Sequence, residues 1–186
     1  MVCFIMAEAH HRKKNPDQVR LALLEGAATL AMEHGLPAVS VQAVSDAAGV
    51  TKGGFFHHFP SKQALLDGMV AWLLEAIDSH IEAAIALDPE PHGCFTRAYV
   101  DLVFQAEVSS GRWATLWIST LTDPQLSMKW AEWYQARLER HRATDTRADL
   151  EAVRLTVGGI WLAGTGGVPI QFPEEHRKRL IAATYQ

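Results

Sequence analysis

The sequence predicts an all-α protein, with three helices at the N-terminus and a larger helical bundle behind them. Two observations predict this class. Apolar residues recur with a period of about 3.6 nearly everywhere along the chain, and no run of alternating β-branched residues interrupts the pattern. Apolar residues make up 48% of the 186 residues and charged residues 20%, which is enough hydrophobic material for a soluble globular fold.

The first helix is expected to begin at Pro16, which suits the first helical position. Asn15 can cap it, and Gln18 stands where a capping box places its second polar residue. Gly35 is expected to end the helix in the left-handed conformation. Between these signals runs an apolar stripe formed by Val19, Ala22, Leu23, Ala27, Leu30 and Ala31.

Two short helices are expected next. Ser40 can cap the first of them, which Gly49 ends, and Thr51 can cap the second, which reaches about His58. Glycine readily adopts the positive φ of a tight turn, and Val50 can fill the angle between the two helices. This arrangement is typical of a helix-turn-helix.

A long helix is expected from Lys62 to about Ala86, because apolar residues follow one another there at helical spacing. A break rich in proline and glycine at residues 88–93 separates it from further helices. These are expected at about 92–109, 112–121, 124–143, 147–163 and 173–185. The predicted domains are an N-terminal arm at 1–14, a helix-turn-helix domain at 15–60 and a helical bundle at 61–186.

The segment from Ser40 to Leu66 resembles the TetR family of bacterial transcriptional repressors, and the likeness covers about 45 residues from Pro16 onward. The matching positions are the Ala48-Gly49-Val50-Thr51 turn, Gly53, the aromatic pair Phe55 and Phe56, Phe59, and Ser61-Lys62 followed by Leu65. The resemblance implies a homodimeric repressor, with a C-terminal domain for ligand binding and dimerisation. Its partners would be a palindromic DNA operator and a small-molecule effector.

The resemblance implies that the third helix enters the major groove with its N-terminal end. Lys52 can donate there to guanine, and the backbone of Gly53 and Gly54 can approach the bases. Phe56 stands where the family usually carries tyrosine, so a phosphate hydrogen bond is missing. The predicted DNA-contacting residues are Ser40, Gln42, Thr51, Lys52, Gly53, Gly54, Phe56, His57 and Lys62.

Three details complete this interface. Lys62 and the free N–H groups at the start of the long helix are expected to hold one phosphate. His57 is expected to face DNA, and His58 to pack against the first helix. The basic run at residues 12–14 is either a disordered lead or an arm that touches a neighbouring groove.

All six tryptophans lie between residues 72 and 161, outside the helix-turn-helix. Packing in the hydrophobic core explains any single tryptophan. A cluster of tryptophans in the ligand-binding domain that the resemblance implies favours a pocket for an apolar or aromatic compound. Asp101 and Glu107 are candidates for binding a cationic ligand. The predicted pocket residues are Trp72, Phe95, Tyr99, Leu102, Val103, Trp113, Trp117 and Trp133.

The adjacent glycines Gly158 and Gly159 cost a helix interior about 1 kcal/mol each relative to alanine. One explanation is the close approach of a second helix. The resemblance to the TetR family implies that the last two helices of each subunit form a four-helix dimer interface, to which Leu180, Ile181 and Ala183 would add a second layer. The other explanation is a kink that opens the pocket.

Charge and composition exclude several function classes. The formal net charge of −4 excludes a uniformly basic DNA coat. Residues 1–62 hold six basic and five acidic residues, against eleven and sixteen in the remainder, so a polyanion would prefer the N-terminal part. No apolar stretch reaches the roughly 18 residues of a membrane span, and the apolar start is too short for a secretory signal, so we expect a cytoplasmic protein.

No metal, cofactor or catalytic site is expected. Cys3 and Cys94 lie outside any CxxC spacing, and His57 and His58 lack a third ligand at helical spacing. No nucleophile elbow, HExxH motif or phosphate loop is present. Two alternatives remain: a partner-binding scaffold without DNA binding, and a small helical enzyme that uses His57, His58 or His141.

Overall fold

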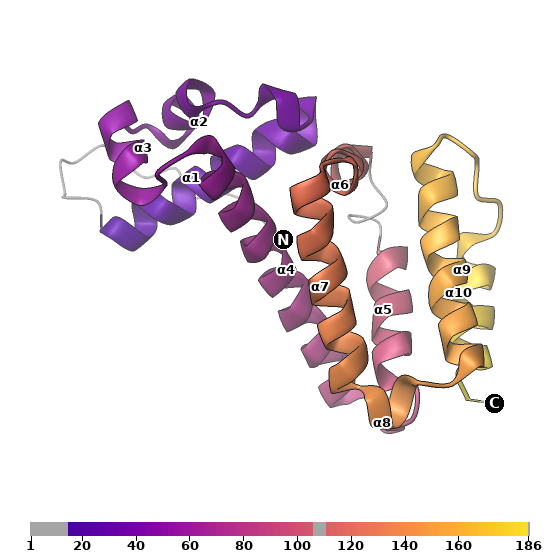
Figure 1. Cartoon of the computed structure of the whole chain (residues 1–186). Coiled ribbons are helices and arrows are strands. Elements are labelled where there is room, and N and C mark those ends of the chain that lie inside the picture. Colours follow the sequence, from indigo (N-terminus) through magenta and orange to yellow (C-terminus); the bar gives the residue numbers. More distant parts are fainter. Residues whose placement is uncertain (1–14, 106–110, 186) are drawn as a thin grey trace.

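A computed structural model describes residues 15–105 and 111–185, and within these residues it confirms the all-α fold class (Figure 1). Helix α1 spans Pro16–His34, the short 3-10 helix η1 Leu36–Ala38, α2 Val41–Ala48 and α3 Lys52–His58. The Ser40 and Thr51 hydroxyls each accept a hydrogen bond at 3.1 Å from the backbone N–H three residues ahead. Gly49 adopts the left-handed φ of +62° between α2 and α3. These caps are the ones that the sequence predicted.

Helix α1 begins at Pro16 behind the Asn15 cap, as predicted, but its C-terminal end differs from the prediction in detail. Gly35 has the expected positive φ, +77°, but its ψ of 170° is extended instead of left-handed helical, because the chain turns at once into η1. The Gly35 N–H still donates to the Ala31 carbonyl at 2.9 Å and closes the last turn. At the start of α1, the Asn15 side chain accepts from the Asp17 N–H at 3.3 Å.

Seven helices follow, and each predicted helix has a counterpart among them. They are α4 Lys62–Leu87, α5 Cys94–Phe104, α6 Gly111–Thr122, α7 Pro124–Arg140, α8 Arg142–Asp145, α9 Ala148–Thr165 and α10 Pro173–Ala183. The helix predicted at 92–109 begins only after Gly93, whose φ is +73°, and residues 106–110 lie outside the described ones. The helix predicted at 124–143 is divided at His141, which leaves helical dihedral angles with φ −100° and ψ 20°.

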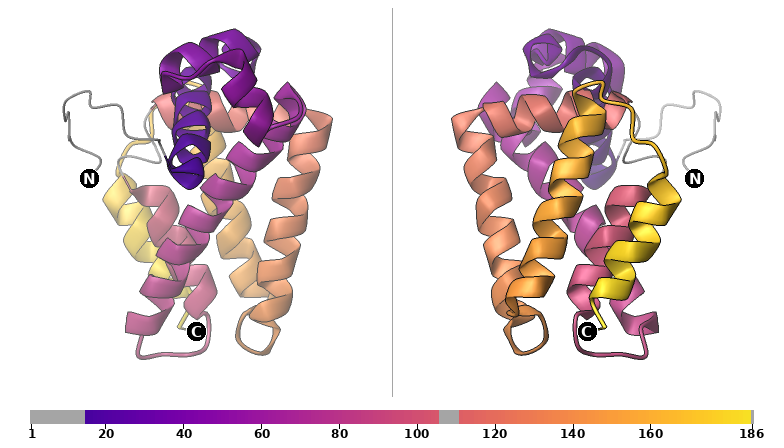
Figure 2. Two further views of the ribbon diagram at one scale, coloured as in Figure 1. Left: turned by 90° about the vertical axis from the view of Figure 1, so that its left-hand side faces the viewer. Right: turned by 90° about the vertical axis from the view of Figure 1, so that its right-hand side faces the viewer.

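Helix α5 contacts α4, α8, α9 and α10 and therefore forms the middle of the bundle. Helix α7 packs against α4 and α6, and α9 packs against α10. Figures 1 and 2 show α4 leaving the N-terminal helices and running the length of the bundle. Helix α6 packs back on α1. The N-terminal helices are thus connected to the bundle by both α4 and α6.

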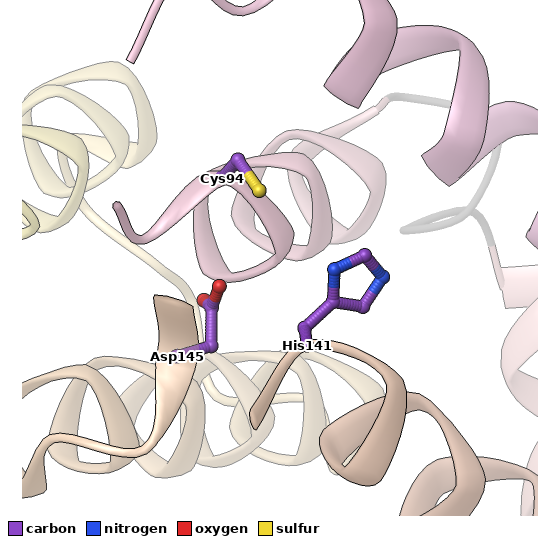
Figure 3. A group of neighbouring side chains, drawn as sticks. All are labelled: Cys94, His141 and Asp145. Carbon is purple, nitrogen blue, oxygen red and sulfur yellow. The ribbon is translucent and has the colours of Figure 1, made fainter. Parts of the chain in front are cut away.

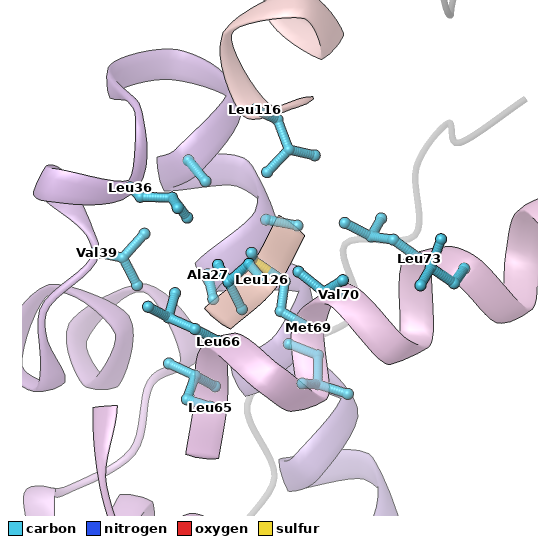
Figure 4. Close-up of a cluster of buried hydrophobic side chains, with 14 of the residues drawn as sticks. Ala27, Leu36, Val39, Leu65, Leu66, Met69, Val70, Leu73, Leu116 and Leu126 are labelled. Atoms are coloured by element: carbon cyan, nitrogen blue, oxygen red, sulfur yellow. The ribbon is translucent and has the colours of Figure 1, made fainter. Parts of the chain in front are cut away.

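One hydrophobic core crosses the predicted domain border at residue 60 (Figure 4). Helix α4 supplies the largest share of this core. Its apolar residues at helical spacing are buried, except for the half-buried Ile77 and Ala84; the buried ones are Leu65, Leu66, Met69, Val70, Leu73 and Ile81. The side chains around it include Ala27, Leu36, Val39, Leu116 and Leu126. Helix α4 therefore packs against both the N-terminal helices and the C-terminal bundle.

The buried side chain of Arg97 connects three helix ends at the end of the bundle far from the N-terminal helices. Arg97 of α5 donates from Nε to the Asp88 carboxylate at 2.6 Å and from Nη1 to the Thr184 hydroxyl at 3.1 Å. Its guanidinium also lies 4.5 Å from the centre of the Tyr185 ring. These contacts join the end of α4, the start of α5 and the end of α10.

None of the helices in the described ranges combines the length and hydrophobicity that crossing a lipid bilayer requires.

Candidate nucleic-acid interface and ligand cavity

Helix α3 is anchored by one residue and exposes its N-terminal end. Phe55 is fully buried, with its ring centre 5.3 Å from that of Phe56 and 6.1 Å from that of Phe59. Thr51, Lys52 and the following glycine are exposed. The core therefore holds α3 by its middle, while its first turn is free to contact a partner.

The glycines of α3 have no internal packing reason. A Cβ on Gly53 would meet only the Thr51 hydroxyl, at 3.8 Å. A Cβ on Gly54 would make ordinary contacts at 3.5 and 3.6 Å with Thr51 and Val50. Within the described part of the chain nothing requires the small side chain, so close approach of an external partner is a sufficient reason for it.

The remaining predicted DNA contacts lie at the same end of the molecule. Lys62 is the first residue of α4, behind the Ser61 cap, and its side chain is exposed. Phe56 and His57 are exposed, whereas His58 is half-buried, as expected from the two faces of a short helix. The Ser40 and Thr51 hydroxyls accept cap hydrogen bonds, which leaves the proton of each available to a phosphate.

Gln42 is less free than the sequence suggested. Its amide Nε2 donates to the Asp46 carboxylate at 2.7 Å, one helical turn away in α2. The amide nitrogen carries a second N–H, which stays available to a base or phosphate, but the hydrogen bond to Asp46 restrains the direction in which the amide points. Asp46 also adds a negative charge to the surface that is predicted to contact phosphates.

A cavity of about 280 Å³ lies among five helices of the bundle. Its walls are apolar or aromatic: Ile77 of α4, Tyr99, Leu102 and Val103 of α5, Trp117 and Leu121 of α6, Trp130 of α7, and Gly158, Trp161 and Leu162 of α9. The Trp117 and Trp130 rings meet edge to face, with centres 5.3 Å apart. Burial raises the pKa of Tyr99 well above its ordinary value, so its hydroxyl is neutral and can donate a hydrogen bond.

Four of the predicted pocket residues line this cavity, namely Tyr99, Leu102, Val103 and Trp117, while their contact with a ligand stays a prediction. The sequence reasoning missed Ile77, Leu121, Trp130, Gly158, Trp161 and Leu162. Trp130 and Trp161 were present in the tryptophan cluster, and Ile77 in the stripe of the long helix. Their spacing alone did not indicate which faces would meet.

The other four predicted residues do not line this cavity, because their side chains pack elsewhere, and their contact with a ligand also stays a prediction. Trp72 lies about 140° around α4 from Ile77 and borders a separate hollow against α1. Phe95 is fully buried between the rings of Tyr99 and His141. Trp113 packs on the main core. Trp133 is buried beside Trp130, with the Arg137 guanidinium 5.6 Å from its ring centre.

The expected interface of the last two helices stays a prediction. Leu180, Ile181 and Ala183 of α10 are half-buried in the single chain, where they pack against the cluster of Tyr99, Val100, Val153 and Val157. The exposed apolar face belongs to α9, on which Leu155 is 70% and Leu162 61% exposed. Gly158 and Gly159 have no atom within 4 Å of an added Cβ. Gly158 borders the cavity, and Gly159 is exposed.

Both the N-terminal and the C-terminal part of the chain match known protein families. The family profile "Bacterial regulatory proteins, tetR family" matches residues 23–69, and the profile "Tetracyclin repressor-like, C-terminal domain" matches residues 93–183. The Transposon Tn10 TetC protein of Escherichia coli is 37% identical over 76 residues, which are 41% of this chain and 39% of that protein. The chain thus matches well under half the length of that relative.

Two longer similarities extend over most of the chain. The HTH-type transcriptional regulator BetI of Vibrio parahaemolyticus is 28% identical over 165 residues, which cover 81% of each protein. The multidrug binding protein EbrR, solved with malachite green, superposes with a TM-score of 0.71 at 20% identity. That superposition covers 89% of this chain and 97% of EbrR, and at this identity it concerns the fold.

Proposed function

The chain belongs to the TetR family of bacterial regulatory proteins, and on this premise we propose that it is a ligand-responsive, homodimeric repressor of transcription. Helices α2 and α3 bind a palindromic operator, and a small apolar or aromatic effector in the cavity releases it. The observation that carries the proposal is the course of α4. Lys62 at its start follows the end of α3 by four residues, and Ile77, about 22 Å along the same helix, lines the cavity.

The proposed release requires no unfolding. An effector shifts α4 only if it binds the DNA-incompetent arrangement more tightly than the competent one. A small displacement of the two α3 helices then prevents a simultaneous fit to both half-sites. This function needs no catalytic chemistry, and it places the protein in the cytoplasm with its operator.

The exposed face of α9 supports the proposed dimer. Leu155, Gly159 and Leu162 recur at helical spacing on this face and are exposed in the single chain. A second copy would cover them, and Gly159 allows the two backbones to approach closely. Helix α10 packs on α9, and its Leu180, Ile181 and Ala183 are half-buried, so α10 stays the second helix of the proposed interface.

Selection from random DNA duplexes tests the function. A two-fold protein reads two-fold DNA, so we expect an inverted repeat with half-sites about one helical turn apart or slightly more. Analytical ultracentrifugation should give a dimer at micromolar concentration. Selected duplexes without an inverted repeat, or a monomer under these conditions, would contradict the proposal.

Lys52 and Lys62 are expected to differ in kind. Lys62→Ala should weaken binding to all duplexes alike and flatten the salt dependence by about one unit, because a phosphate contact releases counterions without reading sequence. Lys52→Ala should relax the preference at one base pair per half-site, at a cost of about 1–3 kcal/mol. Binding titrations with operator and mismatched duplexes at several salt concentrations distinguish the two. Uniform effects of both substitutions across sequences would refute base readout by Lys52.

Filling the cavity is expected to separate effector binding from DNA binding. Gly158 borders the cavity and an added Cβ meets no atom, so Gly158→Leu should extend into the space where the effector binds. Malachite green, which EbrR binds, is a suitable aromatic probe. We expect its affinity, followed by tryptophan fluorescence, to fall at least about tenfold, while operator affinity is unchanged.

Gly158→Ala is the matched control. It brings the same gain in helix propensity, about 1 kcal/mol, without filling the cavity. Its dye affinity should remain that of the original protein. In the original protein, dye and operator should weaken each other by the same factor, ordinarily about 5–150-fold. Equal dye affinity in the leucine and alanine variants would place the effector elsewhere.

A further inference from the structure

Three chemically reactive side chains meet outside the cavity and the DNA-binding end (Figure 3). Cys94 is the first residue of α5, His141 lies between α7 and α8, and Asp145 ends α8. The thiol sulfur, an imidazole nitrogen and a carboxylate oxygen all lie within 4.8 Å of one another. His141 and Asp145 are four positions apart, and Cys94 lies about fifty positions before them, so the fold brings the thiol to the other two groups.

The imidazole of His141 is held by stacking. Its ring lies parallel to that of Phe95, with 5.2 Å between the centres and an angle of 6° between the planes. Figure 3 shows one ring nitrogen directed toward Cys94 and Asp145. This nitrogen is Nδ1, which is bonded to the Cγ carbon. Nε2, on the opposite side of the ring, is buried and has no hydrogen-bond partner among the described residues. Stacking on Phe95 therefore orients the ring with Nδ1 toward the other two side chains.

The carboxylate of Asp145 is also oriented in advance. Its Oδ1 accepts hydrogen bonds from the Thr96 N–H at 2.8 Å and the Thr96 hydroxyl at 2.7 Å. Its Oδ2 accepts from the Thr144 hydroxyl at 2.8 Å. All of these donors are neutral. They occupy three of the roughly four lone-pair positions of the carboxylate, two on Oδ1 and one on Oδ2, and leave one position on Oδ2 for a further ligand.

The Asp145 carboxylate makes no direct ion pair in the described part of the chain. Asp145 is 1% exposed, and the neighbouring Arg97 is paired with Asp88 at 2.6 Å. The buried Arg154 is the nearby counter-charge, but it donates to the Asp145 main-chain oxygen and to the Thr96 hydroxyl, not to the carboxylate. A bound cation would supply the direct contact to the carboxylate that Arg154 does not make.

We propose that Cys94, His141 and Asp145 form a binding site for one transition-metal ion of the Zn²⁺ class. Thiolate, imidazole and carboxylate are the ligands that Zn²⁺ takes in proteins, at about 2.0–2.3 Å, and three of them leave the fourth position to water. Closing the triad onto an ion requires the donor atoms to approach one another by about 1 Å. This site revises the expectation that the chain holds no metal.

A metal bound here would fix the start of α5 against the junction of α7 and α8. Helix α5 carries three residues of the cavity wall, and Phe95 stacks on His141 on one side and on Tyr99 on the other. The proposal does not depend on DNA binding, since metal binding and operator binding are measured separately.

Cobalt titration of the full chain, after treatment with a chelator, tests the site. We expect a thiolate-to-cobalt charge-transfer absorption that saturates at one Co²⁺ per chain and disappears when Zn²⁺ displaces the cobalt. At a hundred times its dissociation constant, Zn²⁺ should raise the melting temperature by about 5–10 °C. Absence of the charge-transfer band would overturn the proposal.

Variants locate the site. Cys94→Ser should abolish the charge-transfer band, and His141→Gln should weaken Co²⁺ binding at least about tenfold, which supplies an independent result should Cys94→Ser not fold. The controls are Cys3→Ser, which removes the other cysteine of the chain, and His176→Gln, a half-buried histidine of α10. Both controls should bind Co²⁺ as the original protein does. A band that persists in Cys94→Ser, or that is lost in Cys3→Ser, would refute the assignment.

Discussion

Phe55→Ala is expected to lower the free energy of unfolding by about 3–5 kcal/mol and to abolish operator binding. Phe55 is fully buried and is the one large apolar side chain by which α3 reaches the core. Truncation removes the transfer free energy of the ring and leaves a cavity that the short helix cannot close. Denaturant unfolding and DNA titration measure the two effects.

Phe56→Ala is the matched control for this prediction, since it changes the same residue type one position along. Phe56 is 53% exposed, so its removal should change the free energy of unfolding by no more than about 0.5 kcal/mol. Any loss of DNA affinity in this variant then reports a contact to DNA. Equal destabilisation by the two substitutions would show that α3 is not anchored by Phe55.

Asp88→Ala is expected to cost about 3–5 kcal/mol of stability, because it leaves Arg97 buried without its counter-charge. The two side chains are 13% and 5% exposed, and their charged atoms lie 2.6 Å apart. The matched control is Glu139→Ala, which breaks a pair with Arg142 in which both side chains are 71% exposed. That change should stay within about 0.5 kcal/mol, as for other exposed pairs. Similar losses in the two variants would contradict the role of burial.

The contribution of Asp88 should depend on pH in one direction. Burial alone would raise the pKa of Asp88, but the hydrogen bonds from Arg97 and the Glu90 N–H, with the charge of Arg97, hold it below 3.8. A carboxylate whose folded pKa is lowered contributes stability above its unfolded pKa and loses it as the pH falls through the folded value. The difference between Asp88→Ala and the original protein should therefore be constant near neutral pH and shrink below about pH 4. A difference that disappears already near pH 6 would exclude Asp88 as the group responsible.

Local signals explain why so much of the fold could be predicted. Ser40, Thr51 and Ser61 cap helices through hydrogen bonds within three residues, and Gly49 meets the conformational demand of a single turn. The apolar stripe of α4 repeats at the helical period and is buried almost as expected. These interactions involve residues that are close along the chain, so they can be predicted from the order of residues alone.

The two candidate sites differ in the same way: one is built from neighbouring residues, and the other from helices that are distant along the chain. The DNA-binding end lies within one continuous segment, and its predicted residues are at the surface except for the half-buried Gly54. The cavity draws on five helices, and the sequence identified only part of its wall. Trp72 and Trp133 have the right chemistry but point elsewhere, because the rotation of a helix about its axis is set by the helices that pack on it.

The sequence by itself determined the helical class, the caps, the helix-turn-helix and the apolar character of a sensor domain, since each follows from residue type and short-range spacing. Only the tertiary structure decided which faces meet. It packed Leu180 and Ile181 partly against α5 and α9, left Leu155 and Leu162 exposed, and brought Cys94 to His141 and Asp145 from a distant position. Helix crossing angles and loop lengths control these meetings, and small differences in packing between distant residues decide them.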